Sequence, residues 1–297
     1  MFKTIDLKNI TAAEAQNFLQ HAVAPRPIAF ASTIDNSGHV NLSPFSFFNL
    51  FSIQPPIVIF SSSSRVRDNS NKHTLENIQE VPEVVINIVT YDMVQQVSLS
   101  SSEFPKGVNE FDKAGFTQIE SKKIRPPRVK ESPVQMECKV LETKPLGETG
   151  GAGTLVIAEI LVLHVNSGIL DETGSIDQQK LLLTARLGGN WYAKITPDNL
   201  FQVKKPNREI GIGVDSLPEA IKKSNFLTGN QLARLANVSE LPTINPSFHD
   251  EKLTQIFQYF AVDPEELEKE LHQHAATLLD EEKTEEAWQV LLATAQA

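Results

Sequence analysis

The sequence predicts a mainly β protein of the α+β class, in which an antiparallel sheet carries helical insertions and a helical C-terminal extension. Short β-rich runs outnumber helical ones up to about residue 195. Turns, rather than regular helical crossovers, join these runs, which favours a sheet closed as a barrel or sandwich over a doubly wound sheet. Prolines and glycines between Pro197 and Pro218 mark a connecting segment, after which the pattern is helical to the C-terminus.

Caps, turns and apolar periodicity predict the individual elements. Thr11 and Glu14 form a capping-box pattern that opens a helix ending near His21. Apolar runs predict strands at residues 28–34, 40–42, 57–60, 84–89, 134–141 and 155–165. Short inserted helices are expected at residues 74–79, 92–99 and 112–114. Two hairpin loops are expected at residues 35–38 and 147–153; the glycines of the second lead into a strand, whereas a dinucleotide-binding motif would open a helix.

The C-terminal extension carries two predicted helices. Asp263 followed by Pro264 is a strong helix start, and a second helix is expected at residues 284–295. The first helix bears an apolar stripe made of Leu267, Leu271, Leu278 and Leu279. Amphipathic helices usually bury such a stripe, so we expect these helices to dock on the barrel, on a second subunit or on another protein. A separate binding module is the less favoured alternative.

Composition narrows the class of function. The chain has 297 residues, 40% of them hydrophobic, and a formal net charge of -10. This charge argues against nucleic-acid or anionic-membrane binding, since both need a basic face. Cys138 is the only cysteine and lies in an alternating strand, so we expect a buried thiol rather than a nucleophile. No metal-ligand spacing, leader segment or membrane-spanning run is seen, and the expected location is the cytoplasm.

A polar segment that follows the strand at residues 57–60 predicts an anion site. Four serines come directly after this strand, followed by Arg65, Arg67 and then Lys72. Hydroxyl and backbone donors can fix a phosphate while arginine and lysine neutralise its charge. A solvated serine-rich loop is the alternative.

The run at residues 41–52 interleaves phenylalanine, serine and asparagine. Pro44 lacks an N–H donor, which confines the run to an edge or irregular position where its backbone can meet a ligand. Phenylalanine walls and amide groups suit a flat heteroaromatic ring with polar edges. The alternative is a set of core phenylalanines, which we favour for Phe48 and Phe51.

Together these segments resemble the flavin reductase-like family of the FMN-binding split β-barrel, in particular its flavoredoxin-like branch. The resemblance covers roughly residues 1–205 and leaves residues 206–297 as a helical extension outside the family core. The matching pieces are Pro25–Ala29, Gly38–Asn49, Pro55–Pro56, the serine cluster with Arg67, Lys72–Ile78, Pro126–Val134, His164–Val165 and Arg186–Tyr192. One departure is His73, where relatives often carry aspartate.

The resemblance implies an antiparallel Greek-key barrel, a homodimer with flavin sites near the subunit interface, and FMN held without a covalent bond. The residues it implies around the isoalloxazine ring are Ser43, Pro44, Phe45, Ser46, Phe47 and Asn49. Those implied for the phosphate are Ser61, Ser62, Arg67, Lys72 and Thr74. Further cofactor contacts are implied for Arg26 and for a closing segment, contributed by the same or the partner subunit, that contains Arg186, Gly188, Gly189 and Trp191.

The function implied by this resemblance is an FMN-binding flavin reductase that takes hydride from NAD(P)H, with NADH or NADPH left open. We expect His164 to contact the nicotinamide, although a strand histidine paired with a neighbour is an equal alternative. An oxygenase or redox protein is the expected recipient of the electrons. The alternative functions are a non-enzymatic FMN electron carrier and a partner-binding protein with a vestigial flavin site.

Overall fold

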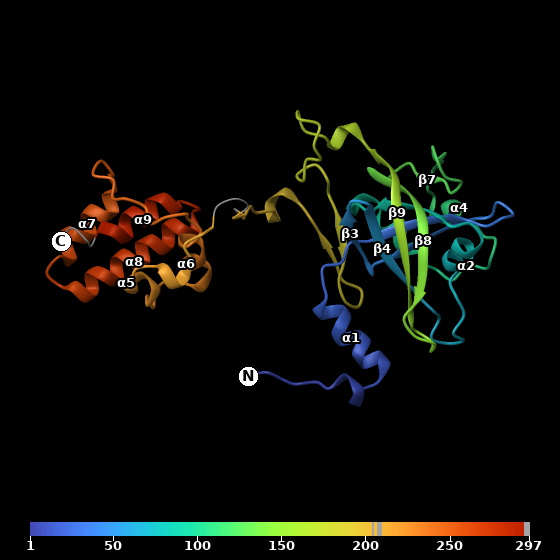
Figure 1. Ribbon diagram of the computed structural model, residues 1–297, viewed down its shortest axis with the longest axis horizontal. Helices are drawn as coiled ribbons and strands as arrows, with labels where there is room; N and C mark the ends of the chain where they lie inside the picture. Colours follow the sequence, from blue (N-terminus) through green and yellow to red (C-terminus); the bar gives the residue numbers. More distant parts are fainter. Residues whose placement is uncertain (204, 207–209, 294–297) are drawn as a thin grey trace. The chain divides into compact units, whose positions relative to one another are not determined.

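The computed structural model describes residues 1–203, 205–206 and 210–293. The chain divides into two compact units, Met1–Phe201 and Gln202–Ala297, which we call the barrel unit and the helical unit (Figure 1). Within the described part of the chain, none of the helices combines the length and the apolarity needed to cross a membrane.

The barrel unit is built on a seven-stranded antiparallel sheet with the order β2-β1-β5-β8-β9-β4-β3, which confirms the predicted sheet type. Its strands are β1 (Ala29–Ile34), β2 (Val40–Phe45), β3 (Phe48–Ile53), β4 (Pro56–Ser63), β5 (Glu83–Ile88), β8 (Val134–Pro145) and β9 (Gly153–Val165). The sequence did not predict β3 as a strand, although it expected this run at an edge or irregular position. It also did not predict two short strand pairs, β6 (Gln118–Ile119) with β7 (Arg128–Val129) and β10 (Thr184–Arg186) with β11 (Tyr192–Lys194).

The sheet curls because its two edge strands follow one another in the chain. β2 ends at Phe45 and β3 begins at Phe48, although these strands stand at opposite edges of the sheet. Among the described residues β2 and β3 do not pair with each other, so the sheet stays open and does not close as the sequence predicted. It packs around an apolar core that includes Phe45, Phe60 and the fully buried Cys138, and burial raises the pKa of this thiol. The prediction of a core cysteine is confirmed. Pro44 lies on the edge strand β2, as its missing N–H donor predicts.

Short helices are inserted between the strands as predicted. The longest helices of the barrel unit are α1 (Ala12–Ala22), which begins with the predicted capping box of Thr11 and Glu14, and α2 (His73–Glu80). The remaining ones are η1 (Leu7–Asn9), η2 (Tyr91–Met93), α3 (Val94–Leu99), α4 (Glu110–Ala114), η3 (Ser167–Ile169) and η4 (Pro197–Asn199). The helix α2 packs on β1 and β2, and this places its first turn beside the edge strand.

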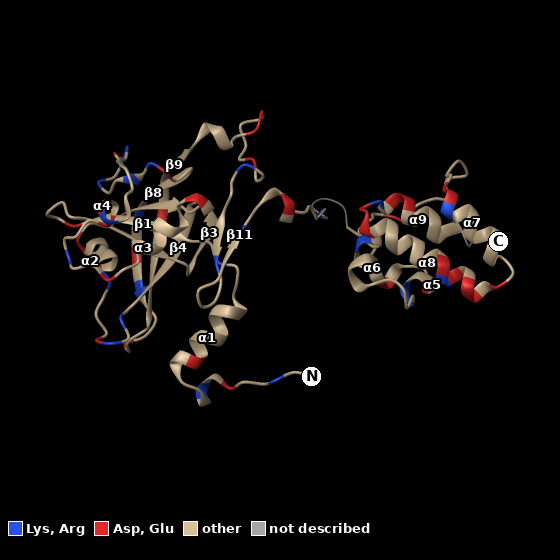
Figure 2. Ribbon diagram, turned by 180° about the vertical axis from the view of Figure 1, so that it is seen from behind, with Lys and Arg blue, Asp and Glu red and all other residues tan. Residues whose placement is uncertain are grey.

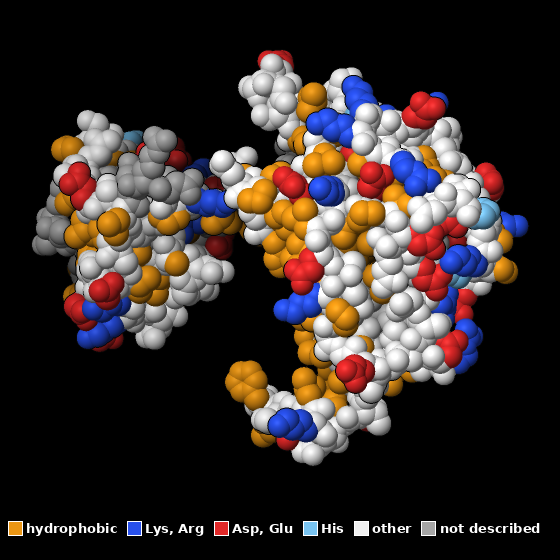
Figure 3. Space-filling model, turned by 45° about the vertical axis from the view of Figure 1, so that its right-hand side comes forward, with side chains coloured by type: hydrophobic (Ala, Val, Ile, Leu, Met, Phe, Trp, Pro, Cys, Tyr) orange, Lys and Arg blue, Asp and Glu red, His pale blue; other side chains and the backbone are white. Residues whose placement is uncertain are grey.

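The placement of one phenylalanine differs from the prediction. Phe48 packs half-buried against the core, as expected, but Phe51 is 63% exposed. The register between β3 and β4 shifts between Leu50 and Ser52, so Phe51 is the unpaired residue of a bulge on an edge strand. Its neighbours Phe47, Leu50 and Ile53 are exposed as well. Figure 3 shows that hydrophobic side chains gather on one face of the barrel unit.

The helical unit contains η5 (Val214–Ser216), α5 (Glu219–Lys222), α6 (Gly229–Leu235), α7 (Glu251–Phe260), α8 (Pro264–Asp280) and α9 (Thr284–Leu292). The predicted start of α8 is confirmed, since the Asp263 carboxylate accepts hydrogen bonds from the backbone of Glu265 and Glu266. The second predicted helix begins at Thr284 as expected, whereas its last expected positions, 294 and 295, lie outside the described residues.

The helical unit has a hydrophobic core of its own. The stripe of Leu267, Leu271, Leu278 and Leu279 is buried there against side chains such as Ile256 and Trp288. The expectation that this stripe needs the barrel, a second subunit or another protein to cover it is therefore wrong. The sequence marked this region only as helical, and α5 to α7 supply the covering surface. Acidic residues are frequent along α8 (Figure 2), where Glu265 and Glu268 are exposed.

Candidate functional site

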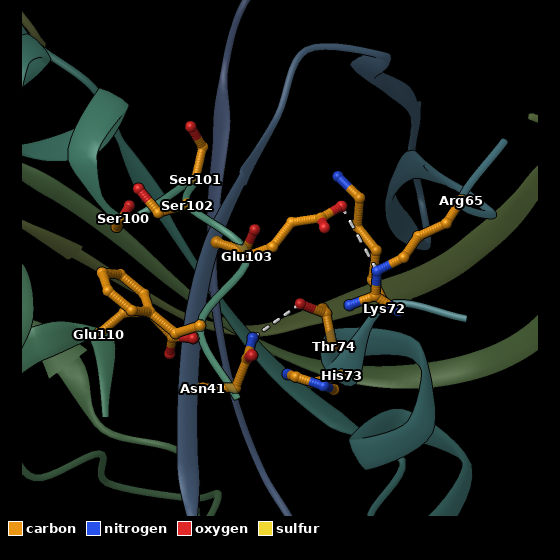
Figure 4. A pocket seen from close by; sticks show the side chains of 12 residues that line it. Asn41, Arg65, Lys72, His73, Thr74, Ser100, Ser101, Ser102, Glu103 and Glu110 are labelled. Carbon is orange, nitrogen blue, oxygen red and sulfur yellow. Dashed lines mark hydrogen bonds and ion pairs between the residues drawn. The ribbon is translucent and has the colours of Figure 1, made fainter. Parts of the chain in front are cut away.

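A polar cavity lies where the edge strand β2, the loop after β4 and the start of α2 meet the segment at residues 100–104. Its lining residues come from five separate parts of the chain (Figure 4), and they are Asn41, Ser43, Arg65, Lys72, His73, Thr74, Ser100, Ser101, Ser102, Glu103, Phe104 and Glu110. Three residues predicted from the sequence are among them, namely Ser43, Lys72 and Thr74. We refer to this site as the polar cavity.

The first turn of α2 forms one wall of the polar cavity. Lys72 is the N-cap residue and its side chain makes no capping hydrogen bond. Thr74 is buried, and its Oγ1 accepts a hydrogen bond of 2.8 Å from Nδ2 of Asn41 on β2. The N-terminus of a helix attracts anions, because its first N–H groups are free and the helix dipole is positive there. The wall therefore presents donors and a positive potential to the cavity.

The Lys72 ammonium is a half-buried cation without an ion-pair partner among the described residues. It lies 5.3 Å from the ring centroid of Phe45. Burial lowers its pKa, the nearby Arg65 lowers it further, and Glu103 acts in the opposite direction. An anion placed beside this ammonium would compensate for its lost hydration. The donors of this wall thus suit a phosphate group.

Of the two arginines in the loop after β4, Arg65 lines the polar cavity. Its Nη1 donates to Oγ of Ser70 at 3.0 Å and to the carbonyl oxygen of Asn71 at 2.5 Å, which holds the guanidinium in place. The Arg67 side chain, named from the sequence, is 72% exposed, pairs with Asp68 and does not line the cavity. The assignment of Arg67 came from the family resemblance, since the local pattern alone does not distinguish two arginines that follow the same strand end.

The two serines assigned to the phosphate lie on β4, outside the lining of the polar cavity. Oγ of Ser62 is buried and has no hydrogen-bond partner within the described residues. The backbone N–H of Ser61 donates to the carbonyl oxygen of Phe47 and thereby ties β4 to the corner between β2 and β3. Their proposed contact with a phosphate remains a prediction.

The residues predicted around a flavin ring form one continuous stretch. Ser43, Pro44 and Phe45 end β2, Ser46 and Phe47 connect the edges of the sheet, and Asn49 lies on β3. Ser43 lines the polar cavity and the ring of Phe45 lies 5.3 Å from the Lys72 ammonium, so this stretch begins beside the wall formed by α2. Oδ1 of Asn49 accepts a 2.8 Å hydrogen bond from the backbone of Leu50.

Arg26, which the sequence assigned to cofactor binding, is buried among backbone carbonyls. Its guanidinium donates to the carbonyl oxygens of Gln20 at 2.6 Å, Val23 at 2.5 Å and Leu187 at 2.8 Å, and it lies 5.8 Å from the ring centroid of Phe47. Burial lowers the pKa of this guanidinium, and Arg186 adds to that effect. The geometry favours a positioning role, in which Arg26 joins α1 and the hairpin of β10 and β11 to the corner between β2 and β3.

The other predicted closing residues lie on the hairpin of β10 and β11. Nη1 of Arg186 donates to the carbonyl oxygen of Trp191 at 3.1 Å, while its guanidinium covers the ring of Tyr192. Gly188 sits so close to His21 that a side chain there would clash with the imidazole ring. Gly189 has a φ of 56°, and Trp191 is 71% exposed. None of these residues lines the polar cavity of the single chain.

His164 is engaged by a carboxylate. Its Nε2 lies 2.7 Å from Oε1 of Glu137, a fully buried residue that also accepts hydrogen bonds of 2.7 Å from the backbone of Lys122 and of Lys123. This arrangement favours the alternative of a strand histidine paired with a neighbour over a nicotinamide contact. In the described residues no group of three or more His, Cys, Asp or Glu is arranged to hold a metal ion.

Comparison with known proteins identifies the family. The model of the flavin reductase like domain matches residues 21–185, and the chain belongs to this family. A relative from Aquifex aeolicus, described as an uncharacterized protein, is 38% identical over 172 residues, which are 58% of this chain and 85% of the relative. The proposed resemblance of the barrel unit to this family is thereby confirmed.

Solved structures identify the fold. Nitrilotriacetate monooxygenase component B from Bacillus cereus is 29% identical, with a TM-score of 0.64 over 68% of this chain and 99% of that one. A flavin reductase with a split barrel domain from Shewanella frigidimarina is 25% identical, with a TM-score of 0.57 over 67% and 95%. Flavoredoxin of Desulfovibrio vulgaris shares the fold at 19% identity, with a TM-score of 0.53 over 69% and 97%. The predicted split-barrel fold is confirmed.

Proposed function

We propose that this protein binds FMN non-covalently and acts as a flavin reductase that uses NAD(P)H in the cytoplasm. Membership of the flavin reductase like family supports the reaction class. When bound, the flavin supplies the redox chemistry, in which it takes a hydride from the nicotinamide and a proton from solvent, so that NAD(P)H is oxidised as the flavin is reduced. The protein then has to bind and orient the two rings, and this task needs no protein acid or base.

The observation that carries the proposal is the half-buried Lys72 ammonium in the polar cavity, which has no ion-pair partner in the described part of the chain. An FMN phosphate at this place would gain charge-assisted hydrogen bonds from Lys72, Arg65 and the first turn of α2. Each such bond contributes roughly 1.5–3 kcal/mol. Riboflavin, which lacks the phosphate, would gain none of them.

The flavin ring would then lie along residues 43–47, which begin at the polar cavity and continue to the corner between β2 and β3. Arg26 would hold the corner at Phe47 against the hairpin of β10 and β11. We propose that the exposed apolar side chains of Phe47, Leu50, Phe51 and Ile53 are covered by a second copy of the chain. In that dimer the exposed Trp191 would close a flavin site, as the family resemblance implies.

The name of the Bacillus cereus structure, a monooxygenase component, suggests a use for the product. We propose that this chain likewise passes reduced flavin to an oxygenase. The alternative is a flavoredoxin-like electron carrier that receives its electrons from a protein rather than from a nicotinamide.

Air-free rapid mixing separates the two functions. The reductase proposal expects NADH or NADPH to bleach the absorbance of the FMN-loaded protein within seconds and expects excess free FMN to be turned over. A carrier would resist both nucleotides and would be reduced fully by dithionite. Absence of bleaching with either nucleotide would overturn the reductase assignment.

A further inference from the structure

A carboxylate reaches into the polar cavity from the segment at residues 100–104. Glu103 points from this segment toward Arg65 and Lys72 (Figure 4). Its Oε1 lies 3.6 Å from Nε of Arg65, and its Oε2 lies 3.6 Å from Nη1 of Arg67. One acidic side chain thus bridges both guanidiniums of the loop after β4.

This bridge is weakly held. The Glu103 side chain is 62% exposed, and both of its ion pairs are long. The Arg65 side chain is only 17% exposed, but a long ion pair to an exposed carboxylate still contributes little to stability, because water screens the carboxylate and ordering it costs entropy. By contrast, Arg65 is fixed independently through Ser70 and Asn71. The Glu103 carboxylate can therefore leave without releasing the arginine from the cavity wall.

An anion that enters the polar cavity meets Glu103 as a competitor. Both would use Nε of Arg65, and two negative groups that share one guanidinium repel each other. A phosphate bound there must displace the carboxylate or accept its repulsion, and either costs part of the binding energy. A flavin without phosphate would not bear this cost.

We propose that Glu103 sets the affinity of the polar cavity for phosphate by competing with it for Arg65, an inference that rests on the flavin-binding function proposed above. When no phosphate is bound, the carboxylate partly neutralises the charges of Arg65 and Arg67. When a phosphate enters, the carboxylate lowers the affinity of the cavity for it. Such a residue would favour release of FMN, as a reductase that exports its product requires.

The test compares FMN and riboflavin titrations of the full chain and of Glu103→Gln. This substitution keeps the size of the side chain and removes its charge. We expect it to tighten FMN binding by about three- to tenfold and to slow FMN dissociation by a similar factor, with riboflavin affinity unchanged. Glu148→Gln is the matched control, because Glu148 is exposed, lies beside the loop after β4 through its backbone carbonyl, and does not line the polar cavity. It should leave both affinities as they are.

Unchanged or weaker FMN binding by Glu103→Gln would overturn the proposal, and weaker binding would indicate that Glu103 holds Arg65 in place. Tightening of riboflavin binding as well would also contradict it, since the effect would then not act through the phosphate. If the unmodified protein binds FMN and riboflavin equally, the flavin-phosphate site itself fails. If it prefers FMN and the variant changes nothing, only the role of Glu103 fails.

Discussion

The barrel unit and the helical unit differ in the polar groups and apolar side chains that their own residues leave without a partner. In the helical unit the leucine stripe lies in a core of its own, and His272 and His274 both have side-chain partners, Ser224 and Asp250. Among its described side chains, Nε1 of Trp288 is a buried donor without a partner.

The barrel unit holds a half-buried ammonium without an ion pair at Lys72, an unpaired buried hydroxyl at Ser62, and an exposed phenylalanine at Phe51. These groups of the barrel unit are the ones on which the proposed ligand site and the proposed subunit contact rest.

The largest expected effect tests whether the helical unit is self-contained. Leu271 is fully buried in its core, so Leu271→Ala should destabilise this unit by about 3–5 kcal/mol. Thermal unfolding followed by circular dichroism should show an early transition in the variant, while FMN titration stays unchanged. Leu241→Ala is the control, since Leu241 is 46% exposed. Loss of flavin binding in Leu271→Ala would show that the helical unit completes the flavin site.

A buried carboxylate of the barrel unit should give the next largest effect. Burial alone would raise the pKa of Glu137, but hydrogen bonds from the Lys122 backbone, His164 and the Lys123 backbone outweigh it and hold the pKa below 4.5. Glu137→Gln should cost about 2–3 kcal/mol at pH 7, because charge-assisted hydrogen bonds are lost. The lowered folded-state pKa means that this contribution is complete above pH 4.5 and is lost as the pH falls through the folded-state value.

Urea unfolding at pH 7 and at successively lower pH measures that difference. The difference in free energy of unfolding between the unmodified protein and Glu137→Gln should become smaller as the pH is lowered. The exposed Glu142 on the same strand offers a control, Glu142→Gln, that should show no such difference. If the difference in free energy of unfolding does not change with pH, Glu137 acts through its shape and not through its charge.

The smallest stability effect concerns Gly188, which the sequence assigned to the cofactor. A methyl group at this position would meet the ring of His21, so Gly188→Ala should destabilise the barrel unit by about 1–3 kcal/mol. Adding His21→Ala should restore most of that loss, because the clashing ring is gone. Gly229→Ala, at a site with open space, serves as the control. If Gly188→Ala weakens flavin binding but leaves the free energy of unfolding unchanged, the original assignment of Gly188 to the cofactor site would be supported.

The sequence predicted those parts of the fold that depend on neighbouring residues, and it missed those that depend on contacts between distant segments. Local patterns such as the Thr11 capping box and the apolar strand of β4 were enough for most of the sheet and the helix starts. The strands β10 and β11, with three residues each, were too short to leave a pattern. The exposed position of Phe51 depends on a bulge against β4, which local periodicity does not contain.

At the candidate site, too, the sequence did not predict the contacts between distant segments. Lys72 was found as a basic residue that follows the serine cluster, and the phosphate roles of Lys72 and Thr74 were implied by the family resemblance. The choice of Arg65 over Arg67, and the arrival of Glu103 from another segment, are decided only when the chain folds. Side-chain direction in a loop and contacts between distant segments leave no mark in a local pattern.

The central claim, that the polar cavity holds the phosphate of FMN, is tested most directly by calorimetric titration of FMN and riboflavin into Lys72→Met and Lys106→Met. Lys106 is the matched control, because its ammonium pairs with Glu76 and does not line the polar cavity. We predict that Lys72→Met weakens FMN binding by about ten- to a hundredfold, or roughly 1.4–2.7 kcal/mol, and leaves riboflavin binding unchanged. Lys106→Met should alter neither affinity. An FMN affinity that survives Lys72→Met, or an equal loss for FMN and riboflavin, would contradict the claim.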